Sequence, residues 1–125
     1  MYKKAIFVLL ILAAFSMFGA CRIVDASTLV TGTPVHMGNA AFKVSSVNLK
    51  KGSKLDLVDD VAVEHIITNG YWNGSTAVHK VEPGAPTVLA QVTGGSMAVG
   101  PFTTAGTYML YCTIHGGMQV KVIVS

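Results

Sequence analysis

The sequence predicts an all-β sandwich, and three observations support this fold class. From residue 28 onward the chain consists of short apolar or alternating runs rich in Val, Ile, Thr and Tyr, the residues that pack well on a pleated sheet. Turn-forming pairs such as Gly38-Asn39, Pro83-Gly84 and Gly94-Gly95 separate these runs. No window keeps the 3.6-residue apolar period of a helix. Short strands at this spacing are typical of a β-sandwich.

The first four strands are predicted at residues 28–37, 42–49, 54–59 and 61–68. The first ends at Gly38-Asn39 and the second at Lys51-Gly52-Ser53, both strong turn signals. The third, KLDLVD, alternates polar and apolar residues as a half-buried strand does. The fourth leads through His65 into Ile66 and Ile67 and ends before Asn69-Gly70.

Five further strands are predicted at residues 77–81, 86–92, 97–102, 107–112 and 119–124. They are rich in β-branched and aromatic residues, and Pro83-Gly84, Gly94-Gly95 and Ala105-Gly106 mark turns between them. Residues 70–76 contain two glycines and no clear alternation, so we expect an irregular loop there, with one helical turn.

The first twenty residues are predicted to be a secretory signal peptide rather than part of the fold. Lys3 and Lys4 precede an apolar run over residues 5–20 that ends in the small pair Gly19-Ala20. Cys21 follows, as in the lipid-attachment sequence of bacterial lipoproteins. We therefore expect an exported protein, periplasmic or extracellular, tethered to the membrane through Cys21, with simple cleavage to a soluble form as the alternative. Residues 21–34 form the lead-in or anchor segment, and residues 35–125 form the folded domain.

Charge and cysteine content narrow the possible partners. The formal charge is +3, but without Lys3 and Lys4 only seven basic residues stand against six acidic ones, so no nucleic-acid partner is expected. We expect a monomer.

Of the two cysteines, only Cys112 lies inside the predicted domain. A disulfide to Cys21 is the minor alternative, and a metal bond would protect this thiol in an exported protein.

The segment Cys112-Thr113-Ile114-His115-Gly116-Gly117-Met118 predicts a copper site. It places a thiolate, an imidazole and a thioether within seven residues, and such ligands select copper over harder cations. The two glycines allow the tight backbone that brings the side chains together. His65, in the upstream strand, supplies the fourth ligand. Two His, one Cys and a weak axial Met are the ligand set of a blue-copper electron-transfer site.

Each ligand also has a plainer interpretation. Cys112 and Met118 can be ordinary core residues, and His65 can be a buried structural histidine. The other metal-capable groups, His36-Met37 and His79, lack a nearby thiol, so we expect surface histidines there.

Three further features are expected to be structural. Tyr71 and Trp72 are expected to pack against the sandwich. Asp59 and Asp60 are neighbours in a strand and should point to opposite faces, so they do not form a catalytic pair. No nucleophile-and-base set or phosphate-binding loop is present, and we expect no enzymatic activity.

From residue 35 to the end, the chain resembles the cupredoxins, the small blue copper proteins that include plastocyanin and amicyanin. The segment Gly106-Thr107-Tyr108-Met109-Leu110-Tyr111-Cys112-Thr113-Ile114-His115 is similar to their C-terminal signature, and residues 42–55 are similar to the strand–turn–strand before the first His. The two-residue spacer between His115 and Met118 is short, as in amicyanin. The resemblance implies a Greek-key β-sandwich of about eight strands with one type 1 copper, shuttling single electrons between larger redox proteins.

Two residues beside His65 depart from the family pattern. The family usually has Pro before this His and Asn after it, whereas this chain has Glu64 and Ile66. The Asn side chain normally ties the His strand to the residue after the Cys, and Ile66 cannot make that side-chain bond. We expect Glu64 to point to solvent, because an ionised Glu is rarely buried.

The leading functional hypothesis is a one-electron carrier that cycles between Cu(I) and Cu(II). The alternative is an extracytoplasmic protein that binds and delivers copper; such proteins favour clusters of Met and His, and only six Met are present here. A third class, a copper enzyme or binuclear oxidase domain, needs a second ligand Cys that the domain lacks.

Overall fold

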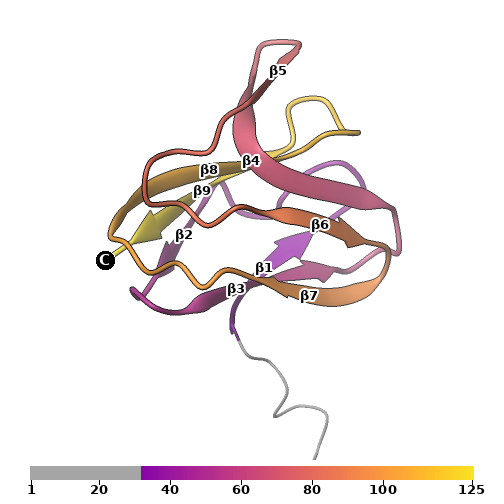
Figure 1. Ribbon diagram of the computed structural model, residues 1–125. Helices are drawn as coiled ribbons and strands as arrows, with labels where there is room; N and C mark the ends of the chain where they lie inside the picture. Colours follow the sequence, from indigo (N-terminus) through magenta and orange to yellow (C-terminus); the bar gives the residue numbers. More distant parts are fainter. Residues whose placement is uncertain (1–31) are drawn as a thin grey trace, which may run out of the picture.

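The computed structural model describes residues 32–125, which form nine β-strands (Figure 1). The strands are β1 (Gly32–Met37), β2 (Ser46–Leu49), β3 (Lys54–Asp59), β4 (His65–Asn73), β5 (Thr76–His79), β6 (Leu89–Val92), β7 (Gly95–Val99), β8 (Gly106–Cys112) and β9 (Gln119–Val124). The predicted signal peptide, Cys21 and the start of the first predicted strand lie outside the described residues. Within residues 32–125 there is no helix that could span a membrane.

The strands form two sheets that face each other, which confirms the predicted β-sandwich. The small sheet has the order β1-β3-β7, with β1 parallel and β7 antiparallel to the central β3. The large sheet has the order β2-β9-β8-β4-β5, and β6 also pairs with β4. β4 is the longest strand: its first residues pair with β6 and β8, and its last residues, from Gly70 on, pair with β5.

The core lies between the inner faces of the two sheets. In β1, β6 and β9 alternate residues are buried, as the two-residue period of a strand requires. β1 buries Val35 and Met37, and β3 buries Leu55 and Leu57 opposite the large sheet. The fully buried core side chains include Phe102, Met37, Leu55, Leu57, Ile67, Leu110, Val120 and Val122. This packed scaffold holds the ends of β4 and β8 at a fixed separation.

Several predicted boundaries are confirmed and others are corrected. The strands at 54–59 and 119–124 match β3 and β9 at both ends. The predicted strand at 42–49 is shorter, because Phe42 makes only an isolated bridge to Met37 and regular pairing begins at Ser46. β2 begins at Ser46 because its pairing with β9 begins at this residue, which lies opposite Lys121.

The predicted irregular loop at 70–76 is wrong. β4 continues to Asn73 and returns as β5, with Asn73 opposite Thr76. The two residues between them are Gly74, at φ +61°, and Ser75. A glycine at the first central position suits the tight two-residue turn of a hairpin. Figure 1 shows this hairpin projecting beyond the sandwich.

Candidate metal centre

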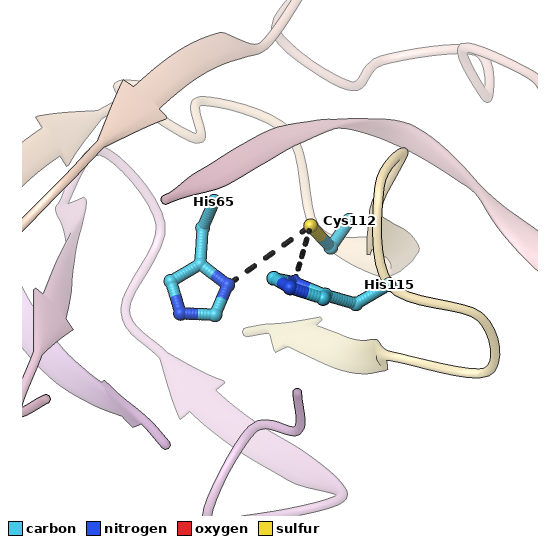
Figure 2. Close-up of side chains that lie close together, drawn as sticks. All are labelled: His65, Cys112 and His115. Atoms are coloured by element: carbon cyan, nitrogen blue, oxygen red, sulfur yellow. Dashed lines mark hydrogen bonds between the residues drawn. The ribbon is translucent and has the colours of Figure 1, made fainter. Parts of the chain in front are cut away.

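Three of the four predicted ligands meet at one end of the sandwich. His65 is the first residue of β4, whereas the sequence predicts a strand that begins at residue 61, and Cys112 is the last residue of β8. The two strands are neighbours, with Ile67 opposite Cys112, so the ends that carry the ligands lie together. His115 reaches the same point from the loop between β8 and β9 (Figure 2).

The separations between the ligand atoms fit a single metal ion. Sγ of Cys112 lies 4.0 Å from Nδ1 of His65 and 3.4 Å from Nδ1 of His115, and the three residues offer ligand atoms that all lie within 4.8 Å of one another. With metal–sulfur and metal–nitrogen bonds of about 2.3 and 2.0 Å, a trigonal plane places sulfur and nitrogen roughly 3.7 Å apart. The thiolate and the two imidazoles are also the donor types that suit copper.

The loop that carries His115 is closed by its own backbone. The N–H of Cys112 donates to the carbonyl of Met118 over 2.9 Å, and the N–H of Met118 donates to the carbonyl of His115 over 3.2 Å. Gly117 has φ +78°, a conformation that favours glycine. These bonds fix Met118 just before β9 with its side chain 1% exposed. The axial role of Met118 remains a prediction.

A backbone bond that continues the β4–β8 ladder joins the neighbours of the two ligands, where Ile66 cannot make the side-chain tie. The N–H of Thr113, the residue after Cys112, donates to the carbonyl of Ile66, the residue after His65, over 2.9 Å. The two ligands are therefore still linked through their immediate neighbours. Glu64 is exposed, as expected, and accepts a hydrogen bond from the side chain of Gln91.

Burial favours the neutral form of His65, the candidate ligand in β4. The ring of His65 is fully buried, and this desolvation lowers its pKa below the ordinary value of 6.5. The nearby Asp59 opposes the shift, and His115 adds to it. The neutral imidazole is the form that binds a metal, so the site favours the form of His65 that metal binding needs.

The other two ligands differ in exposure. Cys112 is a free thiol and fully buried, whereas His115 is only partly buried and its neighbour Ile114 is 48% exposed. The centre therefore has two buried ligands and one ligand that reaches the surface.

Two residues that the sequence does not predict as part of the centre also contact the candidate ligands. The indole N–H of Trp72, on β4, donates to the carbonyl of Cys112 over 3.0 Å. The carboxylate of Asp59, at the end of β3, lies 3.8 Å from Nε2 of His65, with both side chains fully buried. Trp72 was expected to pack against the sandwich, and its ring does meet Tyr111 edge to face. No local sequence pattern indicates that either residue contacts the ligands.

The remaining metal-capable groups lie elsewhere. His36 is an exposed residue that pairs with Asp60, which also binds Lys43, and His79 is exposed on β5. Asp60 lies just after β3 and pairs at the surface, whereas Asp59 is the last residue of β3 and is buried, so the two carboxylates do not share a site. Among residues 32–125, His65, Cys112 and His115 form the one group of three His, Cys, Asp or Glu residues that is close enough to hold a metal.

Comparison with known proteins identifies the family. Residues 30–125 match the family of copper binding proteins described as the plastocyanin/azurin family, so the chain belongs to this family. The resemblance to the cupredoxins is confirmed. A search of curated proteins found no match.

Solved structures support the same fold. Amicyanin from Paracoccus versutus is 21% identical, with 77% of this chain and 83% of that chain covered and a TM-score of 0.57. A reduced amicyanin variant gives 19% identity, coverage of 77% and 84%, and a TM-score of 0.58. The copper-containing nitrite reductase of Thermus scotoductus is 16% identical at a TM-score of 0.59, with 75% of this chain but only 22% of that chain covered. At these identities the likeness shows a shared fold and not a shared activity.

Proposed function

We propose that this protein is a one-electron carrier that binds one type 1 copper through His65, Cys112, His115 and Met118. The observation that carries the proposal is the convergence of the Cys112 thiol and two imidazole nitrogens at the end of a rigid sandwich in a copper-binding family. The bound copper would supply one-electron chemistry by alternating between Cu(I) and Cu(II). Met118 would be the weak axial ligand that blue-copper sites carry.

The protein's own residues would hold the site steady during electron transfer. The backbone bonds from Cys112 to Met118 and from Thr113 to Ile66 limit how far the ligands can move. His65 and Cys112 exclude water, and the partly exposed His115 gives a short path to the surface. Buried, preorganised ligands support a carrier over a copper-delivery protein, whose metal has to exchange.

The proposed carrier works outside the cytoplasm. The apolar run over residues 5–20 after Lys3 and Lys4 supports export, and Cys21 supports a lipid tether. The partners would be redox proteins that dock transiently, and the protein would act as a monomer.

Mass spectrometry of the protein recovered from membranes and from the soluble fraction tests the proposed lipid tether, since a lipidated Cys21 adds the mass of the acyl chains.

The visible spectrum of the copper-loaded protein tests the proposed function. A carrier should bind one copper per chain and show intense thiolate-to-copper charge transfer, and Cys112→Ser should abolish that band. A weak spectrum, with Cu(I) that a mild chelator removes quickly, would instead indicate a copper-delivery protein. If the Cys112→Ser variant stays blue, the ligand assignment is wrong.

A further inference from the structure

The second ring nitrogen of His65 lacks a hydrogen-bond partner. Figure 2 shows one nitrogen of the ring facing Cys112 and the other on the far side of the ring. The nitrogen that faces Cys112 is Nδ1. Nε2 is buried and makes no hydrogen bond with any residue of the described range 32–125. A ring that binds a metal through Nδ1 carries its proton on Nε2. In a buried site that N–H is stabilised by a nearby acceptor or negative charge.

Asp59 is the charged group on that side of the ring. Its Oδ1 lies 3.8 Å from Nε2 of His65, and both side chains are 0% exposed. The backbone carbonyl of Gly38 is an uncharged acceptor near the His65 ring. It also raises the pKa of the ring, though less than Asp59 does. Within residues 32–125, Asp59 forms no ion pair with a lysine or arginine. His65 is the one basic side chain in this range that lies within 4.0 Å of the Asp59 carboxylate.

Two backbone donors hold Asp59 in place and stabilise its ionised form. The N–H of Val61 donates to Oδ1 over 3.1 Å, and the N–H of Gly94 donates to Oδ2 over 2.6 Å. Burial alone would raise the pKa of this carboxyl group, but the Gly94 and Val61 donors, together with His65 and the backbone of Ala62, outweigh burial and lower the pKa below the usual 3.8. A carboxylate in this position meets the general pattern in which the free nitrogen of a metal-binding His faces an acidic side chain.

We propose that Asp59 is a positioning residue of the copper centre, whose buried charge orients the His65 ring and favours the oxidised over the reduced metal. This inference rests on the proposed function. A separation of 3.8 Å exceeds a hydrogen bond, so Asp59 acts mainly through its charge. Cu(II) carries one more positive charge than Cu(I), and a nearby anion in a low-dielectric interior stabilises the more positive state. The charge of Asp59 thus lowers the reduction potential.

The reduction potential of the Asp59→Asn variant tests the proposal. Asn keeps a side-chain oxygen for one of the two backbone donors but removes the charge. We expect the ratio of Cu(II) to Cu(I) affinity to fall about tenfold, which raises the potential by about 59 mV. Because the group is buried, this shift should persist from low to high salt. An unchanged or lowered potential would overturn the proposal.

Asp60→Asn is the matched control, because it makes the same substitution one residue later, at the protein surface. Asp60 is partly exposed and pairs with His36 and Lys43 rather than with His65. In Asp60→Asn we expect the ratio of Cu(II) to Cu(I) affinity to change less than about twofold. Added salt should remove this small change, because the charge is at the surface. Equal shifts in the two variants would mean that Asp59 has no special action on the centre.

A measurement on the zinc-loaded protein separates this proposal from the proposed function. Zn²⁺ accepts the same thiolate and imidazole ligands without redox chemistry. In wild type, the Nε2 proton of His65 should give a slowly exchanging NMR signal, and in Asp59→Asn it should exchange at least about tenfold faster. If Asp59→Asn does not fold, Asp59→Ser retains a hydroxyl acceptor for the turn and serves in both measurements. Equal proton exchange in the zinc-loaded wild type and variant would overturn the proposal, whatever colour the copper form has.

Discussion

The indole N–H of Trp72 donates to the backbone carbonyl of Cys112 over 3.0 Å. The same ring meets Tyr111 edge to face, with centroids 5.9 Å apart. The backbone N–H of Trp72 also donates to the side chain of Gln119 over 2.7 Å. The β4–β5 hairpin therefore covers the end of β8 and fixes the backbone of the proposed thiolate ligand.

Trp72→Phe should destabilise the protein modestly. Phe keeps a ring against Tyr111 but leaves the Cys112 carbonyl without its donor. We expect a loss of about 1–3 kcal/mol in the free energy of unfolding, measured by urea denaturation of the apo-protein. Tyr71→Phe is the control, since Tyr71 is the neighbouring aromatic residue in β4 and has no hydrogen bond to Cys112. A loss of about 1–3 kcal/mol in Tyr71→Phe and none in Trp72→Phe would contradict a stabilising role for the hydrogen bond from Trp72 to Cys112.

Met118→Gln should tune the copper site without destroying it. Gln offers a harder oxygen ligand, which favours Cu(II) over Cu(I). We expect the blue colour to persist and the reduction potential to fall by about 59 mV or more, a tenfold change in relative affinity. Cyclic voltammetry of the two proteins measures this. A potential that stays equal or rises would show that Met118 is a core residue and not the axial ligand.

Most strands, and the three ligands that meet at the centre, could be predicted from the sequence, because their signals are local. β3 and β9 follow from alternation and flanking turns, and Cys112 and His115 follow from their spacing. The hairpin at 70–76 could not be predicted this way, since extended pairing of Gly70 and Tyr71 depends on the opposing β5.

The residues around the ligands depend on tertiary contacts. Asp59 faces His65 because the chain turns sharply between β3 and β4, where Ala62 has φ +56°. Trp72 meets Cys112 across two strands that are 40 residues apart in sequence. Neither contact leaves a local pattern. Similarly, the sequence indicates that Ile66 makes no side-chain tie, but the backbone bond between Thr113 and Ile66 depends on the pairing of β4 with β8.

The apo-protein should lose stability as the pH falls below 7. Burial lowers the pKa of His65 in the folded protein below 6.5, so the unfolded chain binds the proton more readily. The stability due to His65 is present above its unfolded pKa and is lost as pH falls through the folded pKa. Asp59 and Asp60 also have lowered pKa values, and they extend the loss to pH below 3.8.

Thermal unfolding of the apo-protein between pH 7 and 5 measures the contribution of His65. The melting temperature should fall in wild type and change much less in His65→Gln, which has no titrating ring. His79→Gln is the control, since His79 is exposed on β5. This substitution should leave the change of melting temperature with pH as it is in wild type. If the melting temperature falls equally with pH in wild type and His65→Gln, another group controls the acid sensitivity.

A negative charge beside His115 should slow electron exchange between two copies of the protein. The loop that carries this ligand exposes Thr113, Ile114, Gly116 and Gly117, and the sequence has no charged residue from Thr113 to Gln119. Gly116 is the better position to change, because a Cβ there meets no atom within 4 Å, whereas Gly117 has φ +78° and would strain any other residue.

In Gly116→Glu, two like-charged surfaces must meet for self-exchange. We expect the rate to fall about two- to fivefold at low salt and to recover as salt screens the charges. The blue colour should stay unchanged, because Gly116 is not a ligand. Gly116→Gln matches the size without the charge and should exchange as wild type does. NMR line-broadening in mixed Cu(I) and Cu(II) samples gives the rates. If the Glu variant exchanges as fast as the Gln variant at low salt, electrons leave by a surface other than the His115 loop.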